Sequence, residues 1–116
     1  MGLNTTALNA MLDNLGTLIT YASLHTDVVG SGSGGEVTGG SPAYARKAIT
    51  WNAASGGNLD NNANPVFDVP GGTTIRRVGF WSASSGGTYY GDSDITDETY
   101  GAQGTYTLTD ADITLT

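Results

Sequence analysis

The chain has 116 residues, of which 11 are acidic and 4 basic, so its net charge at pH 7 is −7. The length fits one domain, and the acidic excess argues against nucleic acid and anionic membranes as partners because both would repel it. Cysteine is absent, which excludes disulfides, thiolate catalysis and cysteine-bound zinc. With 18 glycines and many threonines, the composition favours short strands joined by tight turns.

Residues 3–15 (LNTTALNAMLDNL) carry the pattern of an amphipathic helix. Asn4 or Thr5 can cap its start, and Gly16 suits the position just past its end. The apolar stripe packs either on the protein's own sheet or on a neighbouring chain. Its members are therefore interface candidates: Leu3, Leu8, Met11, Leu12 and Leu15.

From residue 17 onward the pattern is that of strands. Strands are predicted over residues 18–26, 44–54, 66–69, 73–83, 88–90, 104–109 and 112–116. The glycine pairs of Pro70-Gly71-Gly72 and Ser85-Gly86-Gly87 mark turns, and residues 27–43 form a long Gly/Ser loop of a length that is usually functional or disordered. The fold class expected is mainly β: a small antiparallel β-sandwich or jelly-roll-like barrel with one N-terminal α-helix. Residues 1–116 form a single domain, with the β domain over 17–116.

Two bulky aromatic residues, Phe80 and Trp81, are neighbours in the strand expected at 73–83. Successive side chains of a strand leave opposite faces of the sheet. Unless both faces are covered, one of the two meets solvent or a partner chain, so both are interface candidates.

No catalytic or cofactor-binding motif is present. His25 is the only histidine, and without a GxSxG motif it is expected to be a structural strand residue. Asp92, Asp94, Asp97 and Glu98 are a candidate calcium site, but their order does not match an EF-hand, so a solvated turn is expected. The basic pairs Arg46-Lys47 and Arg76-Arg77 are expected to pair with acidic residues of the chain or of a partner. We therefore expect no enzymatic activity, no metal and no cofactor.

Several stretches resemble small virion proteins of tailed bacteriophages that infect actinobacteria, which are described as tail fibre-like or minor tail proteins. The stretches that carry the resemblance cover most of the chain in order: LNTTALNAMLDNLG, YASLHTD, EVTGGSPAYARKAITWNAASGG, VFDVPGGTTIRRVGFWSASSGGTYYG and TYTLT. The resemblance implies a structural role in a phage particle and brings no catalytic residues.

The resulting hypothesis is a minor tail or tail fibre-type protein that is made in the host cytoplasm and assembles, in several copies or as a homo-oligomer, with other virion proteins. Two alternatives stay open. One is a decoration protein on the outside of the capsid. The other is a carbohydrate-binding module that attaches to host-surface glycans through exposed Trp and Tyr side chains.

Overall fold

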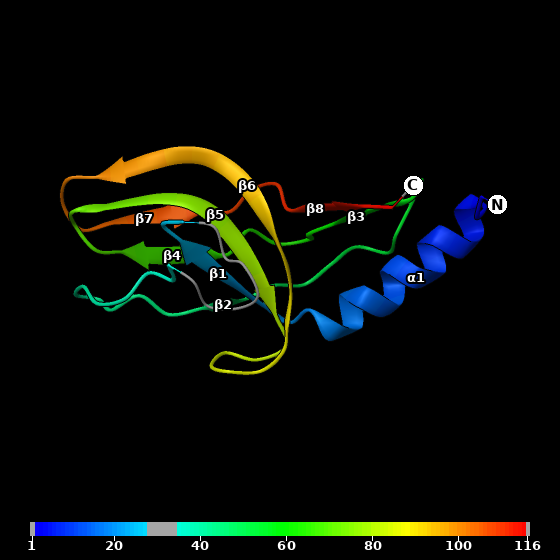
Figure 1. The fold of residues 1–116 in the computed structure, drawn as a ribbon, viewed down its shortest axis with the longest axis horizontal. Coiled ribbons are helices and arrows are strands. Elements are labelled where there is room, and N and C mark those ends of the chain that lie inside the picture. Colours follow the sequence, from blue (N-terminus) through cyan, green and yellow to red (C-terminus); the bar gives the residue numbers. More distant parts are fainter. Residues whose placement is uncertain (1, 28–34, 116) are drawn as a thin grey trace.

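The structure is a computed structural model that describes residues 2–27 and 35–115 (Figure 1). The Gly/Ser loop expected at 27–43 thus lies partly outside the described residues. One helix precedes a series of strands: α1 (Thr5–Leu18), β1 (Tyr21–His25), β2 (Lys47–Ala48), β3 (Asn58–Asp60), β4 (Val66–Val69), β5 (Thr73–Trp81), β6 (Tyr89–Tyr100), β7 (Gly104–Thr107) and β8 (Asp112–Thr114). The prediction of a mainly β fold with one N-terminal helix is confirmed.

All the strand pairs are antiparallel. The main sheet has the order β2-β1-β5-β6, and two further pairs are formed by β3 with β8 and by β4 with β7. The core lies between the main sheet and the β4–β7 pair, since Phe67 and Val69 of β4 join one buried cluster with Leu24 of β1 and Val78 of β5. Two packed antiparallel layers around one core are the arrangement of a small β-sandwich.

Helix α1 starts and ends later than predicted. Asn4 is the N-cap, and its side chain accepts a hydrogen bond from the Ala7 N–H at 2.9 Å. The helix continues through Gly16, which the sequence had placed just past the end, and its C-cap is Ile19. The expected stop at Gly16 was wrong because this glycine lies against Trp51 and Leu59, where tertiary packing carries the helix past it.

Several predicted strands differ in extent from the observed ones, and β3 was not predicted; the two largest differences concern β2 and β6. The strand expected at 44–54 is reduced to Lys47–Ala48, because the segment changes partner: the Ile49 N–H bonds to Thr20 O, next to β1 of the main sheet, whereas the Asn52 N–H bonds to Asp60 O of β3. The solvated turn expected at Asp92–Glu98 is instead the middle of β6, a strand of 12 residues at the edge of the main sheet.

Phe80 and Trp81 are both only 4 % exposed, so the condition under which one of them would meet solvent or a partner chain, an uncovered face of the sheet, does not hold. Phe80 packs against Trp51, with ring centroids 5.9 Å apart. On the other face, Trp81 is covered by Tyr89 at 5.4 Å and by the Arg46 guanidinium, 3.8 Å from the ring centroid. Both faces of β5 are therefore covered within one chain at this point.

The molecule is elongated, with extents of 48 × 24 × 21 Å. Helix α1 and the β3–β8 pair form one end of it (Figure 1). The first and last described parts of the chain meet there, since Leu115 N–H donates to Gly57 O and the Leu8 side chain lies beside Gly57. No helix among residues 2–27 and 35–115 is long and apolar enough to cross a membrane.

Candidate functional site

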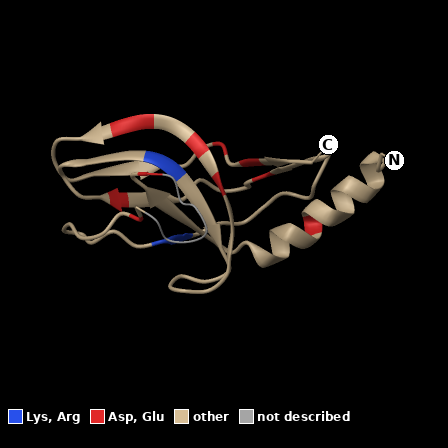
Figure 2. Cartoon of the chain, viewed as in Figure 1, with Lys and Arg blue, Asp and Glu red and all other residues tan. Residues whose placement is uncertain are grey.

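The acidic residues that were considered as a candidate calcium site are spread along one strand and face arginines of its neighbour. β6 carries Asp92, Asp94, Asp97 and Glu98 along its length, and the first three of these pair with arginines of the neighbouring strand β5 (Figure 2). Arg77 contacts Asp92 at 2.9 Å and Asp94 at 3.6 Å, and Arg76 lies 3.4 Å from Asp97. The prediction that the arginines pair with acidic residues is thus confirmed within the chain.

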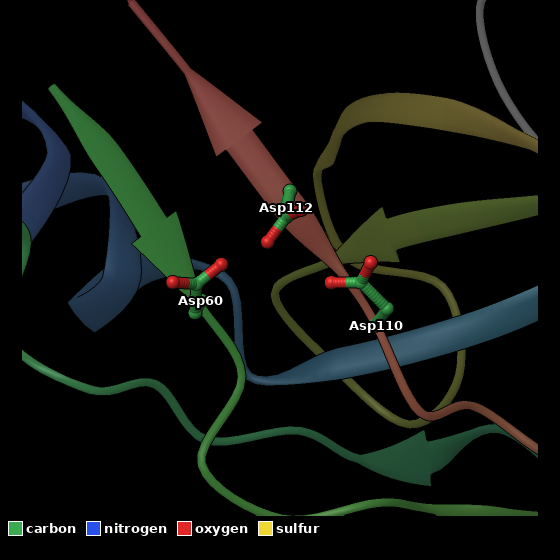
Figure 3. A group of neighbouring side chains, drawn as sticks. All are labelled: Asp60, Asp110 and Asp112. Atoms are coloured by element: carbon green, nitrogen blue, oxygen red, sulfur yellow. The ribbon is translucent and has the colours of Figure 1, made fainter.

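Three other carboxylates gather at the β3–β8 pair, and they were not predicted because one of them, Asp60, comes from about 50 residues earlier in the chain than the other two. Oxygens of Asp60, Asp110 and Asp112 all lie within 4.8 Å of one another (Figure 3). Asp60 and Asp112 are directly opposite in the strand register, and a hydrogen bond to Asp112 raises the pKa of Asp60. All three residues are exposed, so water can solvate them, and carboxylates alone are common on acidic surfaces without an ion.

A serine–histidine pair lies in the interior. Ser23 Oγ and His25 Nε2 are 2.6 Å apart, and the Trp81 indole N–H donates to Ser23 Oγ at 2.8 Å. Both residues are 0 % exposed, so no substrate can reach the hydroxyl. Gly79 makes room for the cluster, because a Cβ there would stand 2.5 Å from Ser23 Oγ. The placement of His25 agrees with the structural role expected from the sequence.

A second polar network holds the Arg46 guanidinium over the ring of Trp81. Arg46 donates to both carboxylate oxygens of Glu36, each at 3.0 Å, and to the carbonyls of Ala83 and Gly86. The Tyr44 hydroxyl also donates to Glu36 at 3.0 Å. Burial by itself would raise the pKa of Glu36, but the hydrogen bonds from Arg46 and Tyr44 outweigh it and lower that pKa below its ordinary value. The Glu36 carboxylate is therefore held charged as part of the scaffold.

The helix stripe divides into two sets. Leu12 is 0 % exposed, and Leu8 and Leu15 are half-buried against the body of the protein. In contrast, Leu3 and Met11 are 51 % and 50 % exposed, and Leu18, which was predicted to lie in a strand and not in this stripe, is 41 % exposed. Met11 and Leu18 are seven residues apart, which is two helical turns, so they share one face of α1. Met11 and Leu18 form the exposed apolar face of the helix, and Leu3 adds an exposed apolar side chain just before the N-cap Asn4.

The described residues thus form a small β-sandwich. Its polar clusters are either buried with their hydrogen bonds satisfied or exposed to water, and its helix presents apolar side chains to solvent. A sequence model of the family described as podophage GP4 fiber I protein gp80 matches residues 3–116. The chain belongs to this family of phage tail fibre proteins and is thus a structural component of the virion tail. No curated protein matches it.

Proposed function

We propose that the protein is a non-enzymatic tail-fibre component that docks onto another virion protein through the exposed apolar face of α1 (Met11 and Leu18) together with Leu3, which precedes the helix. The observation that carries the proposal is the exposure of these three large apolar side chains on one short segment. Apolar side chains gathered on a surface mark interaction sites in soluble proteins.

The attachment of α1 to the body supports this role. Asp13 Oδ1 accepts the Ala54 N–H at 2.7 Å, and Asn9 Oδ1 accepts the Gly57 N–H at 2.9 Å. These bonds, together with buried Leu12, fix the orientation of the helix. The exposed face is therefore held in a fixed orientation, which lowers the conformational entropy that is lost when a partner binds.

The same proposal covers the cofactors, the copy number, the host and the position of the protein in the particle. The protein works without metal or cofactor, is present in several copies or as a homo-oligomer, and is made in the cytoplasm of a host that the resemblance suggests is an actinobacterium. It is a tail protein and not a decoration protein of the capsid, a position that the family supports.

The test is a phage that carries the double substitution Met11→Glu and Leu18→Glu. Both side chains are about half exposed, so the purified variant should melt within a few degrees of the wild type while its incorporation into particles falls sharply. Thr6→Glu is the control, since Thr6 lies about 140° around the helix from Met11 and is also exposed. Gold-labelled antibody on intact particles then locates the wild-type protein.

Normal incorporation of the double variant would remove α1 from the docking surface. Labelling of the capsid shell, with the tail unlabelled, would replace the tail assignment with that of a decoration protein.

A further inference from the structure

A hollow of about 370 Å³ lies where the C-terminal half of α1 meets the segment 49–53. Its lining includes Asp13, Gly16 and Thr17 of the helix and Thr50, Trp51 and Asn52 of that segment. This volume is at the lower end of the range of about 300–1,000 Å³ that is usual for small-molecule sites. None of these residues takes part in the exposed apolar face of α1.

Trp51 is a fixed, partly exposed aromatic wall. Its indole N–H donates to Ile19 O at 3.1 Å, its ring packs on Phe80, and its backbone carbonyl accepts from the Asn62 side chain. The side chain is therefore held from several directions and does not have to be ordered by a ligand. The face of an indole carries negative charge density, so it attracts polarised C–H bonds that stack against it.

Polar groups line the hollow beside this aromatic wall. Asp13 uses Oδ1 to accept the Ala54 N–H; among the described residues no partner engages its Oδ2. The Asn52 side chain makes no hydrogen bond with the described residues either, and it offers both a donor and an acceptor. The hydroxyls of Thr17 and Thr50 donate to Asn14 O and Asn62 Oδ1, which leaves lone pairs for a ligand.

Gly16 keeps the hollow open. It stands inside a helix, where glycine costs about 0.5–1 kcal/mol relative to alanine. A Cβ at this position would lie 3.5 Å from both Trp51 Cδ1 and Leu59 Cδ2, which is ordinary contact distance. Packing therefore does not require a glycine here, and the space beside the indole is left unfilled.

We propose that this hollow binds one ring of a neutral saccharide. A sugar ring presents both an apolar C–H face that can stack on Trp51 and hydroxyls that can bond to Asp13 and Asn52. The net charge of −7 disfavours acidic polysaccharides. The inference is independent of the docking role of α1.

The two tryptophans of the chain allow the site to be tested by NMR. The isolated protein, labelled with ¹⁵N, is titrated with the methyl glycosides of glucose, galactose, mannose, rhamnose and N-acetylglucosamine and, separately, with glucuronic acid. We expect at least one neutral glycoside to shift the Trp51 indole N–H resonance at millimolar concentration. The Trp81 resonance should stay in place because that indole is bonded to buried Ser23. The acid should have a weaker effect.

Variants then locate the contacts. Asn52→Ala should weaken the binding of the glycoside about fivefold, the loss expected for one hydrogen bond, without changing the melting temperature. Asn14→Ala, an exposed asparagine outside the hollow, is the matched control and should bind normally. Trp51→Phe should weaken binding further if it remains folded.

The proposal is overturned if no glycoside moves the Trp51 resonance, or if binding persists unchanged in Asn52→Ala. Shifts confined to Trp81 would overturn it too, since they would place the sugar elsewhere. Because the isolated chain is used, a failure here says nothing against docking in the tail, and failed incorporation into particles says nothing against this site.

Discussion

At the residue scale, the ion pair between Glu36 and Arg46 is well shielded from water, with side chains 17 % and 7 % exposed. The pair also holds the guanidinium over Trp81. A buried ion pair adds little to the free energy of unfolding compared with apolar side chains packed in its place. Removal of one partner is nevertheless costly, because the other charge then remains buried without a counter-ion. The pair between Arg76 and Asp97 offers a comparison, because its side chains are 50 % and 63 % exposed.

We expect Glu36→Gln to lower the free energy of unfolding by about 3–5 kcal/mol, because it leaves the buried Arg46 charge without a counter-ion. Asp97→Asn should change it by about 0–1 kcal/mol, since exposed pairs are screened by water. Denaturant unfolding of the two variants at pH 7 measures both values. Equal effects would show that burial does not distinguish the pairs.

The same variant has a defined pH dependence. The pKa of Glu36 is lower in the folded protein than in the unfolded chain, so its stabilising effect is complete above the ordinary glutamate pKa. The effect is lost as the pH falls through the lowered value. The stability difference between wild type and Glu36→Gln should therefore shrink on acidification below about pH 4.3. A difference that stays constant down to pH 2 would contradict this assignment.

At the element scale, α1 and β6 show how the fold uses its surface. β6 is an edge strand of 12 residues, and its carboxylates charge an edge that would otherwise pair with other chains.

Helix α1 has a glycine in its interior, at position 16. Gly57, in the turn beneath the helix, is different, because its φ of +76° lies in the region that favours glycine.

Alanine substitutions at these glycines should have opposite signs. Gly16→Ala should raise the free energy of unfolding by about 0.5–1 kcal/mol, because the added methyl meets its neighbours at contact distance and the helix gains propensity. Gly57→Ala should be destabilising, since its Cβ would lie 3.1 Å from Leu115 O in a strained backbone conformation. Thermal melts followed by circular dichroism measure both. Destabilisation by Gly16→Ala would show that the hollow beside Trp51 has no room for a methyl.

At the scale of the whole molecule, the apolar interior has a main part and a smaller one. The main buried cluster runs from Ile19 to Ala111 and, among the described residues, does not include Leu12 or Leu59. These two are nevertheless only 0 % and 1 % exposed and belong to the end formed by α1 and the β3–β8 pair. The helix thus covers a satellite of the core.

Deletion of residues 1–16 should therefore leave a folded β domain. The loss of Leu12 and of the Asp13 and Asn9 contacts should cost about 2–5 kcal/mol, as for other deletions of buried leucine side chains. The truncated protein should keep its β-type circular dichroism and a cooperative melt at a lower temperature, and should enter particles poorly. A spectrum without β structure would show that the helix is required for the main core to form.

The sequence by itself determined the class of fold, the existence of α1, the short strand Val66–Val69, the turns around Gly72 and Gly86 and the pairing of arginines with acidic residues. These features follow from local periodicity, turn chemistry and charge, which neighbouring residues encode. Only the tertiary structure decided that both Phe80 and Trp81 are buried, since their covers, Trp51 and Arg46, come from about 30 residues earlier in the chain. It also extended β6 through an acidic segment, because the arginines of β5 neutralise carboxylates that would otherwise favour a solvated turn. The hollow at Trp51 was beyond prediction for the same reason: its walls come from α1 and from a segment that meets the helix only in the folded chain.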